Sequence, residues 1–216
     1  MWIASLRMGI ALSIVVSLFP AAFSRPTKDL AFEARSLSVM AGHEFEFRSR
    51  SDAALAEWAL ERFDRAGLVL PPLRINFHDE PAGCGGHFGL YRAGAAAQVD
   101  ICGFNWDRFV VTARKTILHE LAHAWLGHES SAATRERFVE LRGLSTWGDD
   151  RFPWEEQGSE QAAEIIAWAL MDEQLELTRF RNTSPPALAE AYRHLTGSLP
   201  TLRLQNVLQQ HPEVSW

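Results

Sequence analysis

The chain has 216 residues, and its 21 Lys and Arg against 27 Asp and Glu give a formal net charge of −6. Hydrophobic residues make up 47% of the chain and charged residues 22%, a balance that excludes wholesale disorder. The mild acidity argues against a nucleic-acid-binding protein, which would carry basic patches. The length indicates one domain or at most two.

The N-terminus has the pattern of a secretory signal peptide. Arg7 precedes an apolar run at residues 8–19, and Ala22 and Ser24 have the spacing for cleavage after Ser24. A run this short does not comfortably span a bilayer; an uncleaved N-terminal anchor is the alternative. We therefore expect residues 1–24 to be removed. The remaining single domain, 25–216, is expected to be secreted, periplasmic or extracellular, without stable membrane insertion.

The first half of this domain is predicted to contain strands and one helix. Alternating apolar residues indicate a strand at 38–48. Ser51 is a suitable N-cap for a helix that Gly67 ends. A second strand is expected at 73–78, after two prolines.

A glycine-rich segment with two cysteines, Cys84 and Cys102, follows. Short strands are predicted at 88–92 and 98–102. In an oxidising compartment a cysteine pair is more often a disulfide than a metal site, so we expect a bridge that ties the base of a hairpin. A redox pair or a thiolate zinc site is the alternative, although such zinc sites normally have more Cys or His ligands.

The second half is predicted to be helical. Helices are expected at 108–126, at 132–144, from 155 or 159 to about 179, and at 187–195. The loop between the second and third of these contains Trp147 and Trp154, which could line a pocket or simply pack. Because strands come first and helices later, the element order indicates an α+β protein.

Residues 119–123 spell H-E-L-A-H within the first of these helices. His119 and His123, four residues apart, leave the same helix face and can together bind one zinc ion. Glu120 can then reach a coordinated water as general base. A motif this short also arises by chance, in which case the helix carries two exposed histidines and an unrelated glutamate.

A catalytic zinc ion needs a third protein ligand and one position left for water. In the extended metzincin motif a glycine and a third histidine follow at fixed offsets, but Gly127 and His128 each miss that register by one residue. A later helix offers Glu160 and, one turn on, Glu164 on the same face. The two carboxylates could also form a solvated acidic stripe.

With these residues, the chain resembles zinc metallopeptidases of the zincin superfamily, in its gluzincin branch. The resemblance implies that His119, His123 and Glu160 bind one Zn²⁺ per chain. It also implies that Glu164 supports a zinc-bound histidine, although Asp or Asn is commoner at that position. The layout of signal peptide, cysteine hairpin and HELAHAW resembles small exported bacterial proteins classed as metallopeptidases. The resemblance covers roughly residues 83–170.

The resemblance implies a zincin-like fold with a small, mostly antiparallel N-terminal sheet, a metal-binding helix and C-terminal helices. The implied reaction is hydrolysis of a peptide or protein substrate by zinc-activated water, with Glu120 as general base. Tyr192 or His194 would stabilise the oxyanion. The strand before the metal helix, 98–102, would be the sheet edge that pairs with substrate.

Two other functions are consistent with the sequence. An exported interaction module could keep a structural zinc site, but such sites have four protein ligands. His78, His87 or Asp150 would have to supply the fourth ligand. A zinc-dependent amidase or deacetylase acting on cell-wall material is the other alternative, and no sugar- or wall-binding segment supports it.

Overall fold

The computed structural model describes residues 36–40, 42–94, 97–103, 109–173, 175–200 and 203. The chain divides into two units, and all of the described residues belong to the second, Phe32–Trp216. The predicted signal peptide, with its cleavage after Ser24, lies outside the described residues and stays a prediction. No helix within the described ranges is long and apolar enough to cross a membrane.

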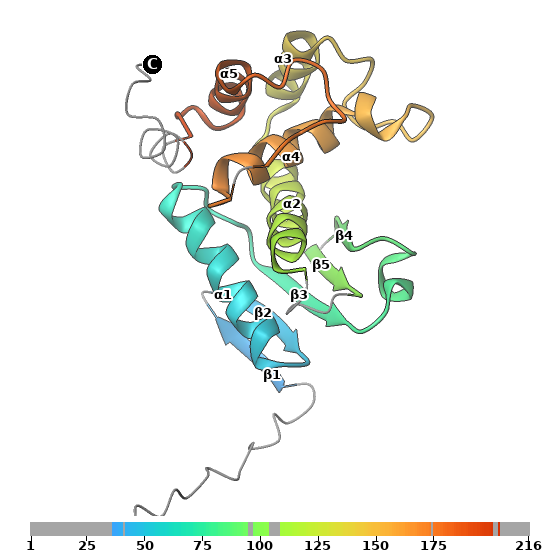
Figure 1. The fold of residues 1–216 in the computed structure, drawn as a ribbon, viewed down its shortest axis with the longest axis vertical. Coiled ribbons are helices and arrows are strands. Elements are labelled where there is room, and N and C mark those ends of the chain that lie inside the picture. Colours follow the sequence, from blue (N-terminus) through green and yellow to red (C-terminus); the bar gives the residue numbers. More distant parts are fainter. Residues whose placement is uncertain are drawn as a thin grey trace, which may run out of the picture. The chain divides into compact units, whose positions relative to one another are not determined.

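A five-stranded sheet with the order β1-β2-β3-β5-β4 forms the N-terminal half of the described structure (Figure 1). Its strands are β1 Ser36–Met40, β2 His43–Phe47, β3 Leu73–His78, β4 Gly89–Arg92 and β5 Ala97–Cys102. The two outer pairs are antiparallel and the two central pairs are parallel. The sheet is therefore mixed, and the expectation of a mostly antiparallel sheet is corrected, because the chain crosses over between β2 and β3 through a helix.

The single strand predicted at 38–48 is a hairpin of β1 and β2. Met40 pairs with His43 at the end of this hairpin. Gly42 has a φ of +84°, in the left-handed region that a tight hairpin turn requires and that glycine adopts without steric cost. The glycine inside the apolar alternation marked this turn.

Two helices cover one face of the sheet. Helix α1, Arg50–Arg65, begins at a capping box in which Ser49 is the N-cap, two residues before the predicted cap. Helix α2, Val110–Glu129, packs against α1, β4 and β5. Between the sheet and these helices lies an apolar core that includes Phe45, Ile75 and Ile101, each with no exposed surface.

The remaining helices form the C-terminal half: α3 Ala132–Arg142, α4 Gly158–Leu170 and α5 Pro185–Thr196. Short 3₁₀ turns, η1 Pro81–Cys84 and η2 Trp154–Glu156, precede β4 and α4. Helix α4 ends well before the predicted residue 179, because Met171 is extended and the Leu170 carbonyl accepts a hydrogen bond from Arg62 at 2.8 Å. The order of sheet first and helices later confirms the α+β class.

Cys84 and Cys102 form a disulfide, as predicted. The bond joins the end of η1 to the last residue of β5, and both cysteines are fully buried. The Cys102 N–H also donates a hydrogen bond to the Phe88 carbonyl at 2.9 Å. The disulfide therefore ties the segment before β4 to the end of β5, and the hydrogen bond holds Phe88 against the same strand.

The predicted edge strand is corrected. Residues 98–102 belong to β5, which lies inside the sheet between β3 and β4. The edge on that side is β4, because the chain forms β4 first and then turns back to insert β5 beside β3. Strand β5, which precedes helix α2 in the sequence, is thus not the edge strand; β4 is.

Candidate metal centre

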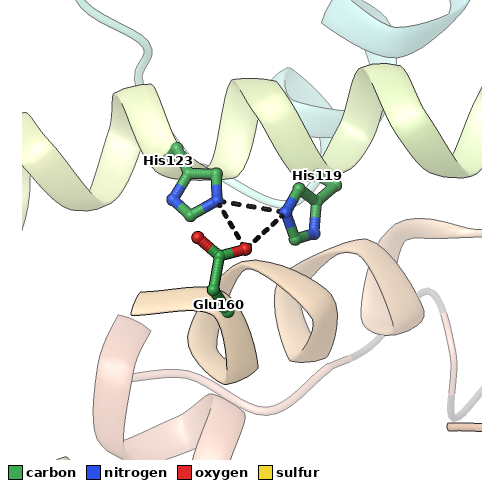
Figure 2. A group of neighbouring side chains, drawn as sticks. All are labelled: His119, His123 and Glu160. Carbon is green, nitrogen blue, oxygen red and sulfur yellow. Dashed lines mark hydrogen bonds and ion pairs between the residues drawn. The ribbon is translucent and has the colours of Figure 1, made fainter. Parts of the chain in front are cut away.

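Helices α2 and α4 bring His119, His123 and Glu160 together (Figure 2). The histidines leave α2 one turn apart, and Glu160 lies in the first turn of α4. The Nε2 atoms of the two histidines are 3.0 Å apart, and Oε2 of Glu160 lies 3.2 Å from Nε2 of His119 and 3.3 Å from Nε2 of His123. All three donor atoms therefore point to one place.

The spacing of these donors fits a zinc ion. Ligands at about 2.0–2.1 Å from a tetrahedral zinc ion are about 3.3 Å from one another, and the three distances here, 3.0, 3.2 and 3.3 Å, are close to that value. Two imidazole nitrogens and a carboxylate oxygen are also zinc's usual ligand types. The residues present therefore fit the metal that the motif implies.

The charges at this place are strongly coupled. Burial alone would raise the pKa of Glu160, yet its hydrogen bonds with His119 and His123 hold that pKa well below its ordinary value. Burial would lower the pKa of His119, but Glu160 and the nearby charges of Glu120 and Glu164 raise it. The carboxylates therefore stabilise a positive charge placed between them, which is the property that a cation-binding site requires.

Glu120 is buried beside this donor group and contacts the edge strand. Burial raises its pKa, which the neighbouring histidines and a hydrogen bond from the backbone N–H of Tyr91 partly offset. Gly89 faces the carboxylate so closely that an added Cβ atom would lie 2.5 Å from Oε1. The backbone of β4 thus lies directly against the predicted general base.

Glu164 lies near His119, where the resemblance places it. Its Oε1 is 3.6 Å from Nδ1 of His119, too far for a hydrogen bond. The same oxygen is 2.9 Å from Nζ of Lys115, a contact the sequence analysis did not anticipate. Within the described residues, Nδ1 of His119 has no hydrogen-bond partner. The contact of Glu164 with His119 is therefore electrostatic.

The donor group opens into a cleft of about 1110 Å³. Strand β4 and the segment before it form one wall, and residues 148–157 lie on the other. The polar stripe of α2 also lines it, with Thr112 and Thr116 beside the two histidines. His119, His123 and Glu160 are therefore open to this cleft.

The structure does not bring Tyr192 or His194 to this cleft. Tyr192 is buried in the core, and burial raises its pKa to about 12. Nε2 of His194 lies 3.0 Å from the backbone carbonyl of Thr134, at the start of α3. Both residues lie on α5, outside the lining of the cleft.

The other candidate ligands do not join the donor group. His87 and Asp150 line the cleft but are not among the three converging side chains. His78 instead contacts Asp100, with 2.7 Å between Nε2 and Oδ1. His128, the histidine of the alternative motif, is exposed and lies next to Glu129.

Two aromatic rings flank the histidines. The ring of Tyr91 is parallel to that of His123, with centroids 6.4 Å apart and planes 6° apart. The indole of Trp154 stacks on His119 at 6.2 Å and 26°. Of these two rings, the sequence pattern indicates Trp154 but not Tyr91. Alternation along 88–92 could have placed Gly89 and Tyr91 on one face, although not which helix that face meets.

No protein-family model matches the chain, and no curated protein matches it. Among solved structures, it is similar to one from Bacteroides caccae described as a "putative zinc-binding metallo-peptidase". The TM-score is 0.33 and the identity 13%, over 75% of this chain and 69% of the other. A likeness this distant leaves the function to be argued from the site itself.

Proposed function

We propose that this protein is a zinc-dependent metallopeptidase that acts outside the cytoplasm on a peptide or protein substrate. One observation carries the proposal: His119, His123 and Glu160 converge at the spacing of tetrahedral zinc ligands. The buried Glu120 lies beside them, at the end of a large cleft. Within the described part of the chain three ligands converge and no fourth joins them, which favours a catalytic site over a structural one.

His119, His123 and Glu160 are the residues that would bind the ion. When bound, zinc supplies Lewis-acid chemistry and makes water more acidic. Glu120 takes a proton from the attacking water and returns it to the leaving amine. Its burial raises the pKa of the carboxyl, the direction that helps a general base to hold the proton before it passes to the leaving amine.

The backbone of β4 is the proposed recognition surface for the substrate. Cys102 donates to the Phe88 carbonyl, and hydrogen-bonded pairs alternate along an antiparallel ladder. The backbone groups of Gly89 and Tyr91 therefore point away from β5. The Gly89 backbone and the Tyr91 carbonyl can pair with an extended peptide that adds to the sheet edge, whereas the Tyr91 N–H is directed to Glu120. The absence of a side chain at Gly89 brings such a peptide close to Glu120.

The buried disulfide supports a location outside the cytoplasm. Disulfides persist in oxidising compartments and are rare elsewhere, and Cys84 and Cys102 leave no free thiol among the described residues. Together with the signal-peptide pattern, this supports export and a mature N-terminus near Arg25. N-terminal sequencing of exported protein that began at Met1 would contradict the proposed cleavage.

The function is tested by comparing metal content with hydrolysis in three proteins. Purified wild type should bind about one zinc per chain and cleave casein or a peptide library. Glu120→Gln should keep the zinc and lose at least about 10²-fold in hydrolysis, as for removal of a general base. Glu160→Gln should lose zinc to a chelator, because two protein ligands hold a catalytic zinc poorly.

Each alternative gives a different result in this experiment. A wild type that binds zinc tightly and cleaves no peptide would support the interaction module. Release of acetate or sugar-linked amine from cell-wall material, without peptide cleavage, would support the amidase or deacetylase. Full hydrolytic activity of Glu120→Gln would refute the role proposed for that residue.

A further inference from the structure

Tyr91 occupies the position on the edge strand that faces the metal helix. In the ladder between β4 and β5, Tyr91 pairs with Val99 and Gly89 pairs with Ile101. Val99 and Ile101 are fully buried against the helices, and side chains of paired residues lie on the same face of a sheet. The side chain of Tyr91 is therefore directed toward α2.

The ring of Tyr91 lies parallel to the imidazole of His123. The two rings are almost parallel, 6° apart, with their centroids separated by 6.4 Å. Its hydroxyl end lies over Gly127, one helical turn beyond His123. A Cβ atom added to Gly127 would lie 3.1 Å from the phenolic oxygen and 3.8 Å from two ring carbons. The missing side chain at Gly127 thus leaves the space that the phenol fills.

The backbone of the same residue contacts the predicted general base. Its backbone N–H faces the Glu120 carboxylate and lowers the pKa of that group. A single residue of the edge strand therefore contacts both a candidate zinc ligand and the candidate base. Metal-binding histidines usually need a partner that fixes the plane of the ring. For His119 the nearest carboxylate is Glu164; for His123 the parallel ring of Tyr91 is in place to do this.

We propose that Tyr91 is a positioning residue of the metal centre. Its ring fixes the imidazole plane of His123, within the space that Gly127 leaves open. Its backbone fixes the carboxylate of Glu120. This inference rests on the proposed function, because it assumes that His123 binds the metal. Packing that restricts a ligand to one rotamer reduces the conformational entropy lost when the metal binds.

The test measures zinc affinity by chelator competition and, separately, kcat and KM for a cleaved peptide. Tyr91→Leu removes the aromatic plane and should weaken zinc binding about 10–100-fold, the range found when a supporting partner is lost, with kcat falling more than KM rises. Tyr91→Phe keeps the ring and should stay within about twofold of wild type. Thermal unfolding of each variant shows whether the fold is kept.

Gly127→Ala provides a second, independent test. Alanine favours a helix over glycine, so this variant should not weaken α2, yet its methyl group would crowd the phenol. Zinc affinity should fall in the wild-type background and change no further in Tyr91→Leu, where the crowded ring is gone. Such non-additivity is expected only when two residues act through one contact. The absorption spectrum of the cobalt-substituted protein should change in the same pattern.

The outcomes separate this inference from the proposed function. Zinc affinity of Tyr91→Leu equal to wild type, or an equal loss from Gly127→Ala in both backgrounds, would overturn the positioning role and leave the peptidase proposal intact. Zinc binding without peptide hydrolysis in wild type would overturn the peptidase proposal, while the affinity measurements still test Tyr91. A wild type that binds no zinc would overturn both.

Discussion

The two walls of the cleft are built differently. The β4 wall, residues 89–92, presents the backbone of Gly89 and the ring of Tyr91 to the site, and buried contacts hold it from behind. The loop wall, residues 148–157, presents side chains, and these are held by other half-buried side chains. This difference predicts that substitutions in the β4 wall greatly lower the rate of hydrolysis. Substitutions in the loop wall should lower zinc affinity only modestly.

Behind the β4 wall lies a buried polar cluster centred on Asp100. This carboxylate, 1% exposed, forms an ion pair with Arg92 of β4 and accepts hydrogen bonds from Asn76 at 3.0 Å and Gln98 at 2.9 Å. A buried carboxylate needs such partners, since its desolvation is costly without them. The Asp100 cluster therefore holds the Arg92 end of the wall, and the disulfide ties the segment before Gly89 to β5.

The loop wall relies on stacked rings. Trp154 stacks on Phe180 with centroids 5.2 Å apart, and the Arg179 guanidinium lies 5.6 Å from the indole centroid. Aromatic pairs of this kind contribute about 0.5–1.5 kcal/mol each, and cation–π contacts at exposed sites about 0.5–1 kcal/mol. No covalent bond reinforces this wall, because the disulfide belongs to the other one.

The largest effect is expected from Gly89→Val in the β4 wall. The new Cβ would overlap the Glu120 carboxylate, whose three nearest atoms lie 2.5–2.8 Å away. Hydrolysis should fall at least about 10²-fold, as when a general base is lost, while zinc content stays near one per chain. Leu90→Val is the matched control, since its side chain lies on the other sheet face. A variant Gly89→Val with normal kcat would contradict the proposed geometry.

The next effect is expected from breaking the disulfide with the double change Cys84→Ser and Cys102→Ser. The bond closes a loop with a sequence separation of 18, and a loop of that size contributes about 3 kcal/mol in the chain-entropy model. The melting temperature should fall, and the loss of activity on heating should follow it. Reductant should lower the melting temperature of wild type and leave that of the double variant unchanged; equal effects on both would contradict the prediction.

A smaller effect is expected from Trp154→Leu in the loop wall. The change removes the ring that stacks on His119, but Glu164 still lies near Nδ1 of that histidine. Zinc affinity should therefore fall by no more than about tenfold, the low end for a lost supporting partner. Phe180→Leu is the control, because Phe180 stacks on Trp154 but does not itself line the cleft. A larger loss of zinc affinity in Trp154→Leu than in Tyr91→Leu would contradict the prediction that the β4 wall has the larger effect.

The sequence predicts those site residues that lie together on one helix, α2. Helical periodicity places Thr112, Thr116, His119 and His123 on one face, and all four line the cleft. Such periodicity is local, so it needs no knowledge of the rest of the fold. The proximity of Glu160 came from the family resemblance and from the room that the intervening chain leaves for a second helix.

The features that the sequence did not predict depend on long-range pairing. The order in which β4 and β5 join β3 decides which strand is the edge, and no local pattern encodes that order. The packing of Tyr91 on His123 follows from the same order and register. The early end of α4 likewise depends on Arg62, a residue far away in the sequence.

The smallest effect is expected from His194→Ala, which tests where the site ends. The family resemblance offers His194 as a residue that stabilises the oxyanion, whereas the structure places its Nε2 atom 3.0 Å from the Thr134 carbonyl, between α5 and α3. Loss of this half-buried hydrogen bond should lower stability by about 1 kcal/mol and leave kcat and zinc content unchanged.

Tyr192→Phe serves as the companion variant, since it keeps the buried ring of the neighbouring residue on α5 and removes only the hydroxyl. Its kcat should also match wild type, because Tyr192 is 1% exposed and lies outside the cleft lining. A fall in kcat of about 10²-fold in either variant, the size expected when one oxyanion donor is lost, would bring α5 into the active site in the catalytic state. Helix α5 would then line the cleft together with the β4 wall and the loop wall. The residue that stabilises the oxyanion would come from α5, as the resemblance implies.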